Sequence, residues 1–221
     1  WSLEELAKLP IKWYGGADLS KMHDLTGVAL HGRYKDIDIA ITHAFMPVVQ
    51  AHIKADEDHI PFFWWEEMEW LTMCNGGVID YDDPVKWFVK MRAMGFKIKW
   101  IGYDRRYSRE FVLRAKKAGF KVFDQPQRYV EKTEAFREVE NQYIEQKFYY
   151  CHNRAYEYCI ENVKAIEDSD DFVRFEKIDK HLRIDLFDAD IIAAKQMLKD
   201  MERTQKAAEW FGIGKKGKTD E

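Results

Sequence analysis

Hydrophobic and polar residues alternate along three stretches near the start of the chain, and this pattern predicts three consecutive β-strands. The first stretch, KWYGGADLS, has strand character up to Asp18, and the second is TGVALHGRY. In the third, DIDIAITHAF, isoleucines at every second position alternate with polar or small residues, which is the period of a half-buried strand. Three strands in direct succession predict an antiparallel meander.

Helices and strands are predicted to alternate in the middle of the chain. DDPVKWFVKMRAMG is predicted to be a helix, with Asp83 as its cap, Pro84 in its first turn and Gly95 at its exit. FKIKWIGYD follows as a strand that ends at Asp104, then a helix that Ser108 can cap, and then the strand FKVFD. A strand, a helix and a strand in this order predict a right-handed parallel crossover. The sheet is therefore expected to be mixed.

The last third of the chain is predicted to be mainly helical. TEAFREVENQYIEQKF has a helical apolar face with Thr133 as its cap, and a short helix follows near Tyr156. ENVKAIE and DFVRFEK flank an acidic turn at residues 168–171 and predict a β-hairpin. A long terminal helix is predicted to begin near Asp185.

The fold class that follows is α/β, with a mixed sheet whose first three strands are antiparallel and whose later strands are parallel, flanked by helices. The chain has no internal repeat and no low-complexity linker, so we expect one domain over residues 1–221. Residues 1–11 are expected to be an N-terminal linker and residues 211–221 a flexible C-terminal tail. The chain begins with Trp1 rather than Met, which suggests a piece of a longer protein.

Composition excludes several classes of protein. With 46% hydrophobic and 15% aromatic residues, a chain of 221 residues can bury an ample core. Its three cysteines form no C-x-x-C pair, so neither a disulfide scaffold nor a zinc ribbon is indicated. The apolar runs are shorter than the roughly 18 residues of a membrane span, and no secretory leader opens the chain. A soluble protein of a reducing, intracellular compartment fits best.

Positive charge is concentrated in the middle of the chain. Residues 86–132 hold 14 Lys or Arg against four acids, so this stretch carries +10, and a net charge of −4 leaves −14 for the remainder. Clustered Lys and Arg side chains make the phosphate contacts of nucleic-acid-binding proteins. The stretch predicts a side of the domain that faces a polyanion, with solvated helix faces as the alternative.

The string GIGKKGKT, at residues 212–219, matches the phosphate-binding loop pattern G-x-x-x-x-G-K-[ST]. That loop requires a strand before it and a helix that starts at its Lys-Thr pair. Here a predicted helix comes first, and only two residues follow Thr219. We therefore interpret the match as part of the tail and look elsewhere for the chemistry.

Four aspartates stand where the predicted elements end or begin. Asp18 ends the first strand and Asp104 the fourth, while Asp185 and Asp188 open the last helix three residues apart and so share one helix face. Two-metal phosphodiester hydrolysis needs carboxylates from separate elements to hold two cations roughly 4 Å apart. These residues are therefore our candidates for metal binding and catalysis.

Each of these aspartates has a simpler explanation when taken alone. Asp18 suits a turn, Asp104 a strand end and Asp185 a helix cap. Their joint placement favours the functional interpretation, because two carboxylates about 4 Å apart repel by about 4 kcal/mol at an effective dielectric constant of 20. A fold would avoid such a cluster unless a cation stabilised it.

Four motifs in order and spacing resemble the C-terminal nuclease domain of tailed-bacteriophage terminase large subunits, the DNA-packaging terminases. They are GGADLSKMHDLTGVAL, HIPFFWWEEMEWLTMCNGGVIDYDD, IKWIGYDRRYS and YCIENVKAIEDSDDFVRFEKIDKHLRIDLFDADIIAA, and the resemblance covers roughly residues 12–200. It implies a ribonuclease H-like fold, divalent metal, and endonucleolytic cutting of concatemeric double-stranded viral DNA during genome packaging.

The resemblance also assigns roles to the aspartates. The first aspartate of the family falls on Asp18, the second on Asp104, and the third on either Asp185 or Asp188. By this resemblance two divalent cations, Mg²⁺ or Mn²⁺, are bound: Asp18 bridges both, Asp104 and Asp188 hold one each, and Asp185 is a further ligand or orients one. The chain departs from the family pattern at Arg105, where relatives often have Pro.

Further expectations concern the partners. Candidates for binding the DNA backbone, drawn from the basic stretch, are Arg105, Arg106, Lys116, Lys117 and Lys121. The resemblance implies double-stranded DNA, an N-terminal packaging ATPase domain of the same polypeptide, the portal and the small terminase subunit as partners, and no membrane. It places the protein in the host cell cytoplasm, in the viral packaging motor and not in the mature virion.

Two alternatives remain open from the sequence. A Holliday-junction resolvase or another ribonuclease H-type nuclease would use the same acid cluster, and a resolvase would prefer four-way junctions over linear duplex DNA. A non-catalytic domain that docks on DNA or on a motor partner would use the basic side and need no divalent ion.

Overall fold

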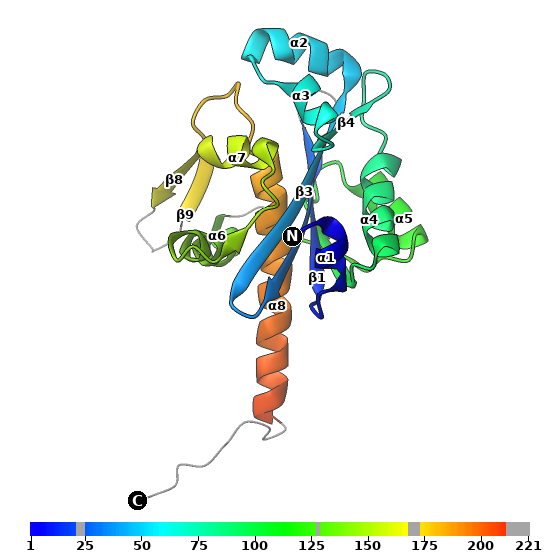
Figure 1. The fold of residues 1–221 in the computed structure, drawn as a ribbon. Coiled ribbons are helices and arrows are strands. Elements are labelled where there is room, and N and C mark those ends of the chain that lie inside the picture. Colours follow the sequence, from blue (N-terminus) through cyan, green and yellow to red (C-terminus); the bar gives the residue numbers. More distant parts are fainter. Residues whose placement is uncertain (21–24, 127–128, 168–172, 211–221) are drawn as a thin grey trace, which may run out of the picture.

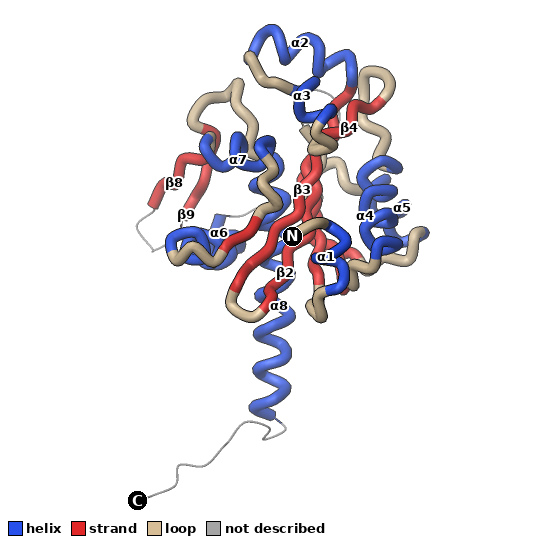
Figure 2. The backbone as a smooth tube through the Cα atoms, viewed as in Figure 1, coloured by secondary structure: helices blue, strands red, loops and turns tan. Residues whose placement is uncertain are grey.

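Strands from both halves of the chain join in one mixed sheet, shown in Figures 1 and 2 for the computed structural model. The structure describes residues 1–20, 25–126, 129–167 and 173–210, with only the backbone of residues 129–131. The strand order is β4-β3-β2-β1-β5-β6, with β7 paired to β3 beside this path. The strands of the sheet are β1 (Trp13–Asp18), β2 (Thr26–Tyr34), β3 (Ile37–Pro47), β4 (Leu71–Cys74), β5 (Ile98–Tyr103), β6 (Val122–Asp124) and β7 (Phe148–Tyr149).

The pairing of the strands confirms the predicted mixed sheet. The first three strands form an antiparallel meander, in which β2 pairs with both β1 and β3. The fifth strand pairs in parallel with β1, and β6 pairs in parallel with β5 after a crossover through helix α5 (Arg109–Lys117). The turn of the predicted hairpin lies outside the described residues, but its strands β8 (Val163–Glu167) and β9 (Val173–Lys177) pair antiparallel as a separate small sheet.

Helices cover both faces of the large sheet (Figure 1). Helices α1, α4 and α5 pack on one face around a core that includes Leu6, Phe88 and Phe111. Helices α6, α7 and α8 pack on the other face with residues such as Tyr156 and Ile191. The helices are α1 (Leu3–Lys8), α2 (Val48–Asp58), α3 (Phe62–Glu67), α4 (Asp82–Met94), α5 (Arg109–Lys117), α6 (Tyr129–Ile144), α7 (Arg154–Glu161) and α8 (Asp185–Trp210).

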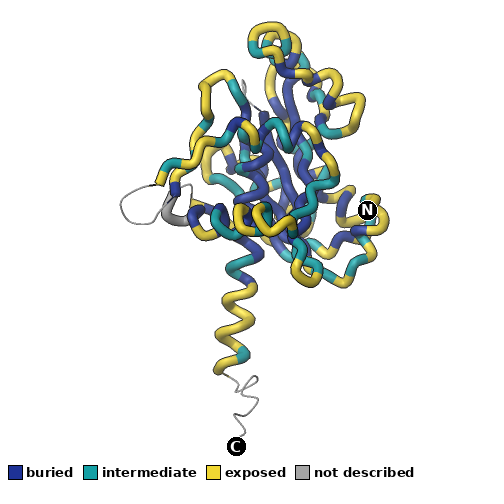
Figure 3. Tube along the Cα trace, turned by 60° about the vertical axis from the view of Figure 1, so that its left-hand side comes forward, coloured by how far each residue is buried: buried dark blue, intermediate teal, exposed yellow. Residues whose placement is uncertain are grey.

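Helix α8 is buried along its first half and exposed along its last turns (Figure 3). Residues such as Ile191, Ile192 and Ala193 are fully buried against the sheet, whereas the helix beyond Asp200 is mostly exposed. Within the described ranges, no helix is long and apolar enough to cross a lipid bilayer. The phosphate-loop match at 212–219 follows this helix and lies outside the described residues.

The predicted helix caps differ from those in the structure. Asp83 lies within α4, which begins at Asp82, and Ser108 precedes α5 but donates its hydroxyl hydrogen bond to the Arg105 carbonyl at 2.8 Å. Thr133 is inside α6, where its hydroxyl donates to the Val173 carbonyl at 3.2 Å. Gly95, in contrast, is the predicted exit of α4, with the left-handed φ of 114° that glycine adopts without strain.

The N-terminal segment predicted to be a linker contains helix α1. Its Ser2 side chain accepts a hydrogen bond from the Glu5 N–H while Glu5 accepts one from the Ser2 N–H, which is a capping box. Leu6 is fully buried in the core on that face of the sheet. These two local features fold residues that precede the first strand.

Candidate metal centre

Asp18 and Asp104 lie side by side at one edge of the sheet. Strands β1 and β5 are parallel neighbours in which Ala17 is paired with Tyr103, and each aspartate comes directly after its member of this pair. The Asp104 N–H donates to the Ala17 carbonyl at 3.1 Å. Since side chains alternate along a strand, both aspartates project from the face that carries α8.

Helix α8 brings Asp185 and Asp188 to this same edge. Its first turn lies directly on β2, where a Cβ at Gly27 would be 2.4 Å from the Asp185 carbonyl oxygen. Gly27 is also the residue of β2 that pairs with Asp18 in the sheet register. The backbone of Asp185 therefore lies beside the strand pair that ends in Asp18, at a distance that only glycine permits.

The four aspartates share one electrostatic field. Burial raises the pKa of Asp18 well above its usual range, and the nearby carboxylates of Asp188 and Asp185 raise it further. Burial likewise raises the pKa of Asp104, although its carboxylate accepts a hydrogen bond from the Arg106 N–H at 3.0 Å, which opposes the shift. Perturbed pKa values of clustered carboxyl groups are typical of functional sites.

Lys132 is a fifth member of this cluster that the sequence analysis does not assign to the site. It comes from α6, is 5% exposed, and its ammonium group forms an ion pair with the Asp188 carboxylate. Its positive charge also lowers the pKa values of Asp18 and Asp104. In the sequence this residue is one of the 14 basic residues of the stretch 86–132, and only the packing of α6 on α8 distinguishes it.

Comparison with known proteins decides the family. The model of the family described as "Terminase large subunit, endonuclease domain" matches residues 12–202. The chain belongs to the nuclease-domain family of terminase large subunits. The resemblance inferred from the sequence motifs is thereby confirmed. Among curated protein sequences, none matches the chain.

Solved structures show the fold of this terminase nuclease domain. The large terminase of bacteriophage HK97 superposes with a TM-score of 0.77 at 20% identity, over 85% of this chain and 40% of that one. The large terminase nuclease of thermophilic phage G20c gives 0.57 at 9% identity, over 85% and 83% of the two chains, and the same nuclease with bound magnesium gives 0.54 at 10% identity, over 85% and 82%. The predicted ribonuclease H-like fold is confirmed.

The residues of the terminase nuclease domain suit divalent metal in their chemistry. Carboxylate oxygens are the ligands that hard cations such as Mg²⁺ prefer, and the aspartate cluster supplies them from three elements. As the side chains stand, no three His, Cys, Asp or Glu residues of the described part form a ready cage for an ion. The carboxylate of Asp188 forms an ion pair with Lys132 in this arrangement.

The predicted DNA-binding residues are exposed but lie in two places. Arg105 and Arg106 directly follow Asp104, and Arg105 forms an ion pair with Asp124 at the end of β6. The other three lie where α5 ends and before β6 begins. Since β5 and β6 run in parallel toward the acidic edge, this second group, Lys116, Lys117 and Lys121, lies toward the opposite end of the strands.

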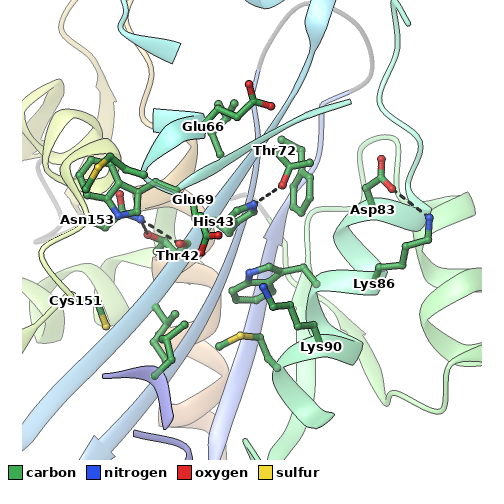
Figure 4. Close-up of a pocket in the computed structure, with 18 residues that line it drawn as sticks. Thr42, His43, Glu66, Glu69, Thr72, Asp83, Lys86, Lys90, Cys151 and Asn153 are labelled. Carbon is green, nitrogen blue, oxygen red and sulfur yellow. Dashed lines mark hydrogen bonds and ion pairs between the residues drawn. The ribbon is translucent and has the colours of Figure 1, made fainter. Parts of the chain in front are cut away.

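A cavity of about 700 Å³ lies away from the aspartates, on the side of β3 and β4 that faces α4 (Figure 4). His43 shares a hydrogen bond of 2.8 Å with the Thr72 hydroxyl there and stacks on Trp87. Burial, with the nearby Lys90 charge, lowers the pKa of His43 to about 4. None of the predicted metal or DNA ligands lines this cavity, so we place the candidate site at the aspartates instead.

Proposed function

We propose that this terminase nuclease domain is a metal-dependent endonuclease that cuts concatemeric double-stranded viral DNA during genome packaging. The observation that carries the proposal is that four aspartates converge at one edge of the sheet: Asp18, Asp104, Asp185 and Asp188. Burial and the negative charges of neighbouring aspartates raise the pKa values of Asp18 and Asp104. A cluster of this kind is costly without a cation. The family assignment supports a nuclease as the reason for it.

The proposed roles follow the positions of the side chains. Asp18 would contact both cations, because the charges of Asp188, Asp185 and Asp104 all act on it, while Asp104 and Asp188 would hold one each. Asp185 would be a further ligand or would orient one. When bound, two cations such as Mg²⁺ or Mn²⁺ supply an activated water and a stabilised leaving oxygen. The magnesium reported for the G20c nuclease supports a divalent ion.

Arg105 and Arg106 would hold the DNA backbone beside the acids, because they follow Asp104 in the chain. Lys116, Lys117 and Lys121 would extend this contact along the duplex, away from the cutting site. Contacts of this kind are made to phosphates and not to bases. We therefore propose cleavage with little sequence preference, and DNA binding whose affinity falls steeply as the salt concentration rises.

The place of the domain in a larger machine is also a proposal. The chain spans 40% of the HK97 large terminase, so the activity of a whole terminase requires more than this domain. We propose an ATPase domain of the same polypeptide as the neighbour, with the portal and small terminase subunit as further partners. The site of action would be the host cell cytoplasm during packaging.

Nicking and linearisation of supercoiled plasmid tests the proposal directly. We expect the purified chain to cut in Mn²⁺ or Mg²⁺ and not in EDTA, and Asp18→Asn and Asp104→Ala to be inactive. Asp56→Asn, an exposed aspartate in α2, is the matched control and should cut like the wild type. Cleavage that survives Asp104→Ala would contradict the proposed mechanism, and a marked preference for four-way junctions would indicate a resolvase instead.

A further inference from the structure

Lys132 is held firmly at the metal centre by its own helix. The next residue, Thr133, accepts a hydrogen bond from the Val173 N–H at 3.1 Å and donates one to the Val173 carbonyl at 3.2 Å. Phe136, one turn further along α6, is buried and stacks on Phe175. The backbone that carries Lys132 is thus fastened to β9, and the side chain reaches from there to Asp188.

The Lys132 side chain is also confined on its other side. Its ammonium nitrogen lies 5.2 Å from the centre of the Phe175 ring, within the range of a cation–π contact. A lysine that is 5% exposed is uncommon in proteins unless it is paired. Both contacts hold the ammonium group at one position, against Asp188 and Phe175.

This position is one that a divalent cation would need. In the proposed function Asp188 is a metal ligand, yet its carboxylate is engaged by Lys132, and the cluster does not close around an ion as it stands. The ammonium group of Lys132 pairs with Asp188 in the described part of the cluster, whereas Asp18 and Asp104 feel its charge only at longer range. The two sides of the site therefore differ in how closely Lys132 engages their carboxylates.

We propose that Lys132 is a resident cation of the metal centre, which competes with one of the two divalent ions for Asp188 and gives way when DNA is bound. The inference rests on the proposed function. One ion would bind on the Asp18 and Asp104 side, where the ion pair of Lys132 with Asp188 would not have to break. The second would bind well only after Lys132 has left Asp188, and a phosphate group of the DNA is the anion that would receive its ammonium group.

Such a residue would couple metal loading to the presence of substrate. Without DNA the centre would carry one divalent ion and the ammonium group, and so would be poorly equipped for hydrolysis. With DNA the phosphate would draw Lys132 away, and Asp188 would become available to the second ion. Lys132 would then act both as the partner of Asp188 in the DNA-free protein and as a contact to the reacting strand.

Counting Mn²⁺ ions tests this without any cleavage assay. Free Mn²⁺ is measured by its paramagnetic resonance signal while the DNA-free chain is titrated. We expect the wild type to bind one ion well and a second weakly, and Lys132→Gln to bind the second about tenfold more tightly, because a competing charge has gone. Lys132→Arg keeps the charge and should resemble the wild type. A short phosphorothioate duplex should tighten the second site of the wild type more than that of Lys132→Gln.

The outcomes separate this inference from the proposed function. If Lys132→Gln binds each of the two ions with the same affinity as the wild type does, the competition is disproved while the nuclease proposal stands. If the wild type binds no Mn²⁺ and Asp18→Asn behaves identically, both are disproved. Thermal unfolding in EDTA checks that each variant is folded, and Lys132→Met replaces Lys132→Gln if the latter is not. If the role of Lys132 were only structural, its replacement would lower the unfolding temperature and leave the ratio of the first-ion to the second-ion affinity unchanged.

Discussion

The carbonyl oxygen of Ala189 in α8 lies against Gly16 of β1 so closely that a Cβ at Gly16 would be 2.0 Å from it. A Cβ at Gly27 would likewise be 2.4 Å from the carbonyl oxygen of Asp185. Side chains at these positions would lift the helix from the sheet. The two glycines therefore set the height at which α8 presents its aspartates to Asp18 and Asp104.

Gly16→Ala is expected to destabilise the fold by about 3 kcal/mol or more, because the clash is with backbone that has nowhere to move. Urea unfolding followed by tryptophan fluorescence measures the loss. Gly77→Ala is the matched control, since a Cβ there meets nothing within 4 Å, and its effect should stay within about 0.5 kcal/mol. Equal stabilities for the two variants would disprove the close packing of α8 on β1.

Asp18→Asn is expected to stabilise the metal-free protein at pH 7.5. The folded-state pKa of Asp18 lies above that of the unfolded chain, so ionisation of Asp18 favours unfolding as the pH rises between the two values. Asparagine cannot ionise, so the substitution should add about 1 kcal/mol to the free energy of unfolding in EDTA.

Thermal unfolding with and without Mn²⁺ measures both the stability that Asp18→Asn gains without metal and the stabilisation by the ion that it loses. The ion should raise the unfolding temperature of the wild type and of Asp56→Asn, and have little effect on Asp18→Asn. If Asp18→Asn were less stable than the wild type in EDTA, an ionised Asp18 would not be unfavourable in the metal-free protein, and the prediction would be wrong.

Metal affinity is expected to rise with pH through the raised pKa of Asp18. A carboxyl group must lose its proton to bind the ion, and burial together with Asp188 and Asp185 holds that proton on Asp18 at pH values where an ordinary aspartate is ionised. Calorimetric titration with Mn²⁺ in buffers of different ionisation enthalpy counts the protons released. Affinity that is constant from about pH 5 to pH 8, with no proton release, would contradict the perturbed state of Asp18.

His31 is expected to contribute to stability as a buried cation. Its Nδ1 lies 2.8 Å from Asp190 and its Nε2 lies 3.3 Å from Asp38, on the face of β2 beneath α8. Burial alone lowers the pKa of His31, but the charges and hydrogen bonds of the two aspartates outweigh it and raise the pKa to about 10. Arg33 also pairs with Asp38, but loss of His31 removes the cation beside the buried Asp190, so His31→Gln should cost about 3–5 kcal/mol.

The pH dependence of this contribution has a defined sign. The folded pKa lies above the unfolded value of about 6.5, so the stabilisation is complete below that pH and is lost as the pH rises toward 10. Urea unfolding at pH 6, 8 and 10 should show the gap between wild type and His31→Gln becoming smaller. His52→Gln, on the exposed side of α2, should differ little from the wild type at each pH.

Arg106 and Lys117 are expected to affect DNA cutting in different ways. Arg106 follows Asp104 by two residues, whereas Lys117 ends α5 toward the far end of the strands. Each glutamine variant should weaken duplex binding and lower the slope of log affinity against log salt concentration by about 0.9, the value for one lost phosphate contact. Only Arg106→Gln should also slow cleavage at saturating DNA. Fluorescence anisotropy in EDTA at several KCl concentrations gives the slopes, and a plasmid assay at saturation gives the rates.

Much of the fold follows from the sequence because its signals are local. The alternation in DIDIAITHAF needs only its own residues to specify a strand, and the exit of α4 needs only a glycine in the left-handed region at Gly95. The acidic turn between β8 and β9 predicts their hairpin in the same way. The motifs that gather Asp18 and Asp104 at one edge also follow, since parallel neighbouring strands end together.

Other features depend on partners that are distant in the chain. Thr133 is a residue type that commonly caps helices, but its hydroxyl is hydrogen-bonded to the backbone of Val173, forty residues later. The parallel pairing of β4 with β3, after α2 and α3, likewise leaves no periodic signal in the sequence.

The sequence by itself determined the mixed sheet and the family, and it named the aspartates proposed as ligands, since strand periods, turn residues and spaced motifs are properties of short segments. The tertiary structure alone decided how these aspartates meet and what else joins them. Their approach depends on two glycines that let α8 touch the backbone of β1 and β2, and the ammonium group of Lys132 reaches Asp188 only because α6 packs on α8. Close approach between separate elements is a property of packed surfaces, and no single segment contains it.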